Sequence, residues 1–139
     1  MTVNMEFKYI YTRLNVDNYQ ACKDFYSKVL GFEIVFADDR DEYAELATGQ
    51  TIISIFNRQR LKDFVGTAET VSYDYHYAGV VLSFQVNCLN DAISYLKSNG
   101  VEIVNEPMNF PRRGFITACF RDPDGNLIEL EEVNSYSNF

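Results

Sequence analysis

Cysteine and histidine are scarce in this chain, and tryptophan is absent. The three cysteines, Cys22, Cys88 and Cys119, are widely spaced and form no Cys-x-x-Cys pair, which argues against both a disulfide framework and a zinc knuckle. We expect each of them to pack as a small hydrophobic side chain in a reducing cytoplasm. The single histidine, His76, lies outside every predicted strand. None of these residues is therefore assigned a catalytic role.

Long apolar runs and an excess of positive charge are also missing. No segment has enough consecutive apolar residues to span a bilayer, and the N-terminus lacks the pattern of a signal peptide. The 20 acidic residues outnumber the 12 basic ones, and the net charge of −8 would repel the phosphates of a nucleic acid. We therefore predict a cytoplasmic protein that binds neither nucleic acid nor membrane, and whose ligand is a neutral or cationic small molecule.

A β-α-β-β-β pattern is present in the first half of the chain. The helix begins at Asp17 or Asn18, carries an apolar stripe, and ends at Gly31. The four strands are predicted by short segments rich in branched and aromatic residues. They span Tyr9–Val16, Phe32–Ala37, Glu42–Ala47 and Thr51–Phe56.

The same pattern recurs in the second half. A helix from Asn87 ends at Gly100, and the string "GVEIV" that starts there matches "GFEIV" at Gly31. The strands are predicted over Gly79–Val86, Val101–Val104, Phe115–Phe120 and Asn126–Glu131. Two such units make one duplicated α+β fold, since each half is small for a core of its own. The prediction is a single domain over residues 1–139, with repeat one at 7–57, repeat two at 78–132 and a linker at 58–77.

Alternation along the strands assigns their side chains to two faces of each sheet. The helices should cover an apolar face made by Ile10, Leu14, Val16, Ile53, Ile55, Val80, Leu82, Phe84, Val86, Ile128 and Leu130. The opposite face is mixed and has the character of a ligand-binding cleft wall. It carries Tyr9, Tyr11, Arg13, Ile52, Ser54, Phe56, Val81, Ser83, Gln85, Thr117, Cys119, Leu127, Glu129 and Glu131.

The double β-α-β-β-β plan, the string "FYSKVLGF" and the string "DPDGNLIEL" resemble the vicinal oxygen chelate superfamily. This superfamily contains glyoxalase I, bleomycin resistance proteins, fosfomycin resistance proteins and extradiol dioxygenases. The resemblance implies the glyoxalase/bleomycin resistance/dioxygenase fold, with a cleft between curved mixed sheets, and a homodimer. It does not define the reaction, because one scaffold hosts several chemistries.

Metalloenzymes of that superfamily hold one divalent metal with four side chains. The resemblance places these positions at Tyr11, Ser54, Val81 and Glu129. Valine cannot coordinate a metal, serine is a poor ligand, and a neutral tyrosine is weak. We therefore predict no metal and no cofactor, and we assign no catalytic residue.

The candidate ligand-binding residues are a subset of the mixed face together with Arg113 and Phe115 beside it. They are Glu129, Tyr11, Arg13, Ser54, Phe56, Tyr9, Gln85, Arg113 and Phe115. For Glu129 two interpretations remain open: a carboxylate held by Arg13, Tyr11 or water, or an acceptor for a cation or donor of the ligand. Arg13 is a candidate partner of Glu129 or of an anionic group, while the phenylalanines are either stacking walls or core.

Three functions are compatible with this pattern. The first is a metal-independent binding protein that resembles the bleomycin resistance branch and holds a cationic or aromatic ligand in its cleft. The second is an enzyme, either a lyase or dioxygenase with a metal or a metal-free enzyme with Glu129 as general base. The third is an interaction or sensory module. We favour the first, because three of the four residues at the metal-ligand positions are poor metal ligands.

Overall fold

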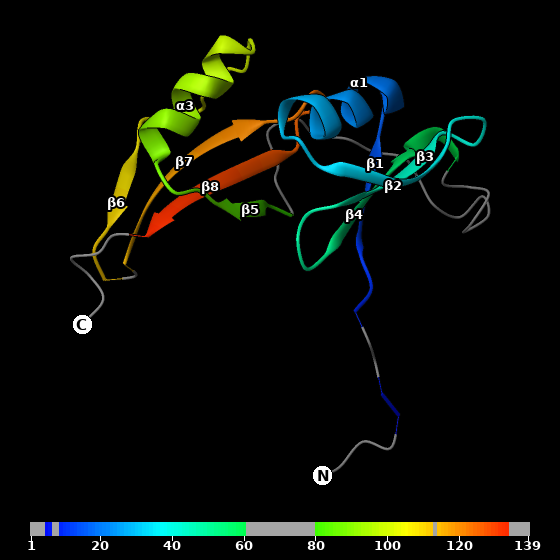
Figure 1. The fold of residues 1–139 in the computed structure, drawn as a ribbon, viewed down its shortest axis with the longest axis horizontal. Coiled ribbons are helices and arrows are strands. Elements are labelled where there is room, and N and C mark those ends of the chain that lie inside the picture. Colours follow the sequence, from blue (N-terminus) through cyan, green and yellow to red (C-terminus); the bar gives the residue numbers. More distant parts are fainter. Residues whose placement is uncertain (1–4, 7–8, 61–79, 113, 134–139) are drawn as a thin grey trace. The chain divides into compact units, whose positions relative to one another are not determined.

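The computed structural model describes residues 5–6, 9–60, 80–112 and 114–133. It divides into two units, Met1–Val71 and Ser72–Phe139 (Figure 1), and the architecture of each is given separately. Each unit contains a four-stranded mixed sheet with one main helix, which confirms the predicted α+β class.

The first sheet has the strand order β1-β4-β3-β2. Its strands are β1 (Thr12–Val16), β2 (Glu33–Asp38), β3 (Tyr43–Ala47) and β4 (Ile52–Asn57). The first and last strands, β1 and β4, pair in parallel, and the other pairs are antiparallel. A short 3-10 turn, η2 (Arg58–Arg60), follows β4.

One helical segment packs on this sheet. α1 (Tyr19–Asp24) begins at Asn18, whose side chain accepts a hydrogen bond from the Ala21 amide at 3.0 Å, as the sequence predicted for a helix cap. It continues as η1 (Phe25–Val29), which has π-helical geometry, and the chain turns at Gly31 with a φ of 78°. The sequence predicted one uninterrupted α-helix here, so the π segment was missed.

The core of the first unit lies between this helix and the sheet. Its members are Leu14, Val16, Tyr19, Cys22, Phe25, Tyr26, Ala44, Leu46, Ile53 and Ile55. The predicted helix-facing residues of β1 and β4 are thus buried. Ile10 is an exception at 66% exposed, because β1 begins only at Thr12 and the residues before it leave the sheet.

The second unit repeats this topology with the strand order β5-β8-β7-β6. Its elements are β5 (Leu82–Gln85), α3 (Leu89–Ser98), β6 (Met108–Phe110), β7 (Phe115–Arg121) and β8 (Leu127–Val133). β5 and β8 pair in parallel, and α3 packs against β7 and β8 (Figure 1). Ile128, Leu130, Ala118 and Phe120 are buried, whereas Val80, which precedes β5, is 66% exposed.

The strand predicted at Val101–Val104 is wrong. Ile103 makes only an isolated bridge with Phe120, and the edge strand is β6, further along the chain. The ladder is interrupted because the Asn105 side-chain oxygen accepts the Cys119 amide at 2.9 Å, where a regular strand would use a backbone carbonyl. The segment therefore crosses the sheet edge in an irregular conformation.

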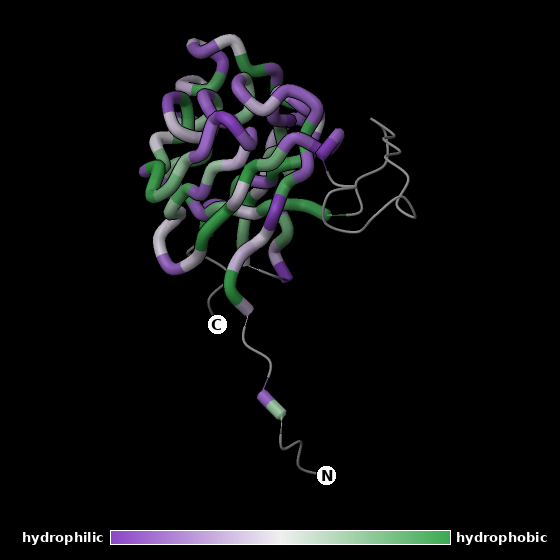
Figure 2. The backbone as a smooth tube through the Cα atoms, turned by 90° about the vertical axis from the view of Figure 1, so that its right-hand side faces the viewer, coloured by the Kyte–Doolittle hydropathy of each residue, from purple (hydrophilic) through white to green (hydrophobic). Residues whose placement is uncertain are grey.

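Hydrophobic residues are not concentrated in one long segment of the chain. Figure 2 shows hydrophobic and hydrophilic residues interspersed along the backbone of the described residues. Among those same residues, no helix is long and apolar enough to cross a membrane.

Candidate functional site

The face of the first sheet opposite α1 carries a row of polar side chains. Strand register places Arg13 beside Ser54 and Ser54 beside Glu45. Side chains in register on one face are neighbours. Ser54 is fully buried, while Arg13 and Glu45 are half-buried, so the row has a closed centre and accessible ends.

Arg13 lies among three aromatic rings. Its guanidinium carbon is 5.7 Å from the centroid of Tyr11, 5.9 Å from that of Tyr43 and 5.6 Å from that of Phe56. Its Nη2 also donates to the Tyr11 hydroxyl at 2.9 Å. A cation over ring faces at such distances is attracted by their quadrupoles. The rings therefore hold the planar guanidinium in place.

The rings continue across the sheet toward its edge. The Tyr43 centroid is 6.1 Å from that of Phe36 on one side and 6.1 Å from that of Phe56 on the other. These separations fall in the range of favourable aromatic pairs. We call Phe36, Tyr43 and Phe56 the aromatic row. A pocket of about 250 Å³ lies beside it, and its walls are Arg13, Asp38, Asp41, Tyr43 and Phe56.

The Tyr43 hydroxyl is a fixed group in this site. It donates to the Glu45 Oε2 atom at 2.5 Å. Burial raises the pKa of Tyr43, the hydrogen bond to Glu45 raises it further, and the Ser54 hydroxyl opposes this shift. The phenol thus stays protonated well into the alkaline range and keeps its donor directed at Glu45.

Glu129 on β8 occupies the position in the second sheet that Ser54 on β4 occupies in the first. It lies in register between Ser83 and Cys119, and Ser83 Oγ donates to its Oε1 atom at 3.0 Å. Burial raises the pKa of the Cys119 thiol, and the negative charge of Glu129 raises it further. The carboxylate is half-buried and has a serine as its hydrogen-bond partner. Its pairing with Tyr11 or Arg13, one of the alternatives left open by the sequence, stays a prediction.

The remaining candidate residues belong to both units. Tyr9 is 67% exposed and bonds to the Thr12 side chain, outside the cluster around Arg13. Gln85 is exposed and lies in register with Glu131. The half-buried Phe115 ring packs 5.7 Å from that of Phe110. Arg113 lies outside the described residues.

The four positions at which the superfamily places metal ligands do not fit a divalent cation. The Tyr11 phenol accepts a hydrogen bond from the cationic Arg13, whose charge opposes a metal, and Val81 has no donor atom. Ser54 is buried beneath its neighbours. Within the part of the chain that the structure describes, no group of three or more His, Cys, Asp or Glu side chains could hold a metal ion.

Five members of the site escaped the sequence analysis, namely Tyr43, Glu45, Phe36, Asp38 and Asp41. The alternation of β3 contained the signal, since Ala44 and Leu46 are buried against the helix and Tyr43 and Glu45 must then face away. For β2 the parity is obscured by a bulge. Ile34 pairs with Leu46 but Phe36 already pairs with Glu45, so one extra residue moves Phe36 onto the aromatic face.

Comparison with known proteins gives consistent results. Residues 8–130 match the family model of the Glyoxalase/Bleomycin resistance protein/Dioxygenase superfamily. The uncharacterized protein YraH of Bacillus subtilis (strain 168) is 29% identical over 126 residues, which are 91% of this chain and 98% of that protein.

Two solved structures illustrate the likeness of fold. A glyoxalase/bleomycin resistance protein/dioxygenase from Nocardioides has a TM-score of 0.74 at 16% identity, covering 95% of this chain and 88% of that one. A lactoylglutathione lyase from Agrobacterium tumefaciens has a TM-score of 0.70 at 18% identity, with coverage of 92% and 95%. At such identities the likeness concerns the fold alone.

Proposed function

This chain belongs to the Glyoxalase/Bleomycin resistance protein/Dioxygenase superfamily, and on that premise we propose that it is a metal-independent protein that binds a small aromatic or cationic molecule. The observation that carries the proposal is the set of side chains around Arg13. Where the resemblance places metal ligands, the first unit has a guanidinium enclosed by aromatic rings.

The aromatic row supplies a surface on which a flat ligand can stack. Phe36, Tyr43 and Phe56 lie side by side across neighbouring strands, with their ring planes inclined by 55° and 69°. A flat ligand can therefore stack on the face of one ring and meet the edge of the next. Phe36 is 52% exposed, so the row is accessible from solvent at the sheet edge. A pocket of about 250 Å³ beside the row accommodates part of a small planar molecule.

Acidic side chains give the same pocket an affinity for positive charge. Asp38 and Asp41 line it together with Arg13, and the chain as a whole has a net charge of −8. The carboxylates favour a cation at the outer edge of the pocket, whereas Arg13 disfavours one at its inner end. A planar aromatic ligand with a positively charged substituent directed outward fits both ends.

A binding experiment with model compounds tests this proposal. We would titrate the protein calorimetrically with ethidium, which is aromatic and cationic, with the neutral aromatic quinoline, and with the aliphatic cation tetramethylammonium. We expect ethidium to bind most tightly. The variant Tyr43→Leu should weaken it, since a stacked ring contributes about 1–3 kcal/mol, which is roughly a fivefold to hundredfold change in Kd.

The matched control is Tyr95→Leu, which removes a half-exposed tyrosine from α3 in the second unit. This variant should bind ethidium like the unmodified protein. Equal affinity of Tyr43→Leu and Tyr95→Leu, or the absence of saturable binding by all three compounds, would contradict the proposal.

The enzymatic alternative is tested by metal analysis. The protein would be purified without chelators and then incubated with zinc, nickel, iron and manganese in turn. Because three of the four metal-ligand positions have poor or no donor atoms, we expect that no metal remains in stoichiometric amount after desalting. Near-stoichiometric metal that is lost in Glu129→Gln would overturn the proposal in favour of a metal-dependent lyase or dioxygenase.

The proposal includes two further properties of the protein. We expect a homodimer, as the resemblance implies, and light scattering that gives the mass of a single chain would exclude it. We also expect the protein to act in the cytoplasm, where its three free cysteines remain reduced.

A further inference from the structure

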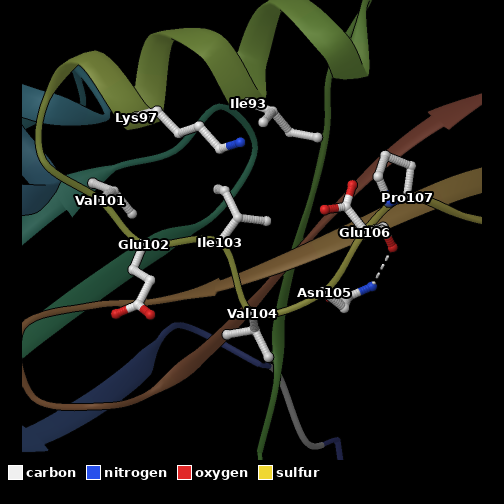
Figure 3. Close-up of a pocket in the computed structure, with 9 residues that line it drawn as sticks. All are labelled: Ile93, Lys97, Val101, Glu102, Ile103, Val104, Asn105, Glu106 and Pro107. Carbon is white, nitrogen blue, oxygen red and sulfur yellow. Dashed lines mark hydrogen bonds between the residues drawn. The ribbon is translucent and has the colours of Figure 1, made fainter.

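A second pocket lies in the second unit, away from the mixed face of its sheet. It has a volume of about 470 Å³ and lies between α3 and residues 101–107 (Figure 3). Its walls are Ile93, Lys97, Val101, Glu102, Ile103, Val104, Asn105, Glu106 and Pro107. None of these residues belongs to the site proposed above.

Both walls of this pocket are held by hydrogen bonds. On one side, the Val101 amide donates to the Leu96 carbonyl and the Gly100 amide to the Lys97 carbonyl, each at 3.0 Å, which fixes the end of α3. On the other side, the Val104 amide donates to the Cys119 carbonyl at 2.8 Å, and the Asn105 side chain accepts the Cys119 amide. The irregular segment is thereby anchored to β7 at a fixed place.

Two unlike charges face each other across the pocket. Figure 3 shows the Lys97 ammonium and the Glu106 carboxylate extending toward one another from opposite walls, with Ile93 and Ile103 between them. Glu102 points away from both. Among the described residues, no ion pair within 4.0 Å involves Lys97 or Glu106. The two charges therefore form no direct ion pair.

The Glu106 backbone contributes to this arrangement. Its carbonyl oxygen accepts a hydrogen bond from Asn105 Nδ2 at 2.9 Å, which is the dashed line in Figure 3. Pro107 follows and fixes the backbone at the next position. The Glu106 side chain is therefore presented by a restrained segment, although the carboxylate itself is exposed.

From this geometry we propose that the pocket binds a zwitterion with an apolar body, namely an amino acid or dipeptide with apolar side chains. The ligand carboxylate meets Lys97, its ammonium group meets Glu106, and its side chain covers Ile93 and Ile103. An anion alone would pair with Lys97 but leave Glu106 unpaired, and a cation alone would pair with Glu106 but leave Lys97 unpaired. A zwitterion satisfies both charges and removes apolar surface from water.

The experiment is an NMR titration of the full chain that follows the methyl groups of Ile93 and Ile103. The probes are L-leucine and L-leucyl-leucine, which differ in the spacing of their charges, and the analogues of each that are blocked by N-acetylation or by C-terminal amidation, such as N-acetyl-leucine and leucinamide. We expect saturable shifts with at least one zwitterion and, because each exposed charge contact is modest, a roughly fivefold weaker Kd for both blocked analogues.

Matched variants separate this site from general charge effects. Lys97→Gln should abolish the preference for L-leucine over leucinamide, and Glu106→Gln the preference over N-acetyl-leucine. Glu102→Gln removes a carboxylate of the same pocket that points elsewhere, so it should retain both preferences. All three side chains are exposed, and their substitution should leave the fold intact.

Two results would overturn the proposal. One is the absence of saturable shifts at Ile93 and Ile103 with either zwitterion at concentrations well above roughly 1 mM. The other is equal affinity for the zwitterions and their blocked analogues. A failure here leaves the ethidium experiment unaffected, because that experiment reports on Tyr43 in the first unit.

Discussion

The substitution Tyr43→Phe separates the two roles that this residue has in the candidate site. It removes the hydroxyl that donates to Glu45 at 2.5 Å but keeps the ring between Phe36 and Phe56. Glu45 is half-buried, so water replaces part of the lost interaction. We therefore expect a loss of about 1 kcal/mol in the free energy of unfolding, near the middle of the range for single hydrogen bonds.

The pH dependence of that loss follows from the pKa of Tyr43. Burial and the bond to Glu45 raise this pKa above its ordinary value of 10.0. A raised pKa contributes stability that is fully present below the unfolded value and disappears as the pH rises through the folded value. The stability of the unmodified protein should therefore fall above pH 10.0, and Tyr43→Phe should fall less steeply. Some decline should remain, because the pKa of Tyr19 is also raised.

The assay is urea unfolding followed by far-ultraviolet circular dichroism, since the chain has no tryptophan to report by fluorescence. The series runs from neutral to strongly alkaline pH, with Tyr95→Phe as the control from α3. Ethidium affinity, measured at neutral pH, should change less than about twofold in Tyr43→Phe because the stacking ring is retained. Unfolding curves of Tyr43→Phe that coincide with those of the unmodified protein at every pH would refute the reasoning.

Three further predictions concern other parts of the two units. Glu129→Gln should accelerate alkylation of Cys119 by iodoacetamide near pH 8, because loss of the negative charge lowers a thiol pKa that burial and Glu129 raise; an unchanged rate, measured by peptide mass spectrometry, would contradict this. Asp39→Asn should destabilise the protein at neutral pH but not in strong acid, because the hydrogen bond from Lys23 lowers the pKa of Asp39. The stability that this ionised carboxylate contributes is lost as the pH falls through its pKa in the folded protein, and urea unfolding at several pH values measures the loss. Gly100→Ala should cost about 1–2 kcal/mol in urea unfolding, with Gly100→Asn closer to the unmodified protein, because the φ of 78° rather than lack of space disfavours a side chain there.

Much of the fold could be predicted from local patterns in the sequence. The helix cap at Asn18, the turns at Gly31 and Gly100 and the alternating burial of β8 are all properties of short segments. The repetition of these segments at nearly constant spacing then defined the topology. This is why the class and the order of most elements are confirmed even where strand ends differ.

The parts that were missed depend on contacts between distant residues. The edge strand was placed too early because the Asn105 side chain, and not a propensity of residues 101–104, decides how the chain meets Cys119. The hydrogen bond between Ser83 and Glu129 joins residues 46 positions apart, so alternation alone could not find it. Both residues were assigned to the correct face, but only the register made them neighbours.

Several candidate site residues were predicted to lie together because alternation assigned them to one face of the sheet. The structure brings only some of them together. Tyr11, Arg13 and Phe56 come together, as alternation predicted, because they lie on or beside adjacent strands. Tyr9 was assigned to the same face by parity, but β1 begins after it, and parity ceases to apply once the chain leaves the sheet. Its side chain is largely in solvent.

The parallel pairing of the first and last strands has a consequence for how the chain folds during synthesis. β1 lies at the edge of its sheet and, among the described residues, pairs with β4 alone. The antiparallel meander of β2, β3 and β4 can therefore form before β1 is recruited. Closure of that sheet must wait until Asn57 has left the ribosome, because Val16 pairs with it. The second sheet imposes the same wait on β5 and β8. We therefore expect the two sheets to close in separate steps as the chain emerges, each step limited by a long loop closure.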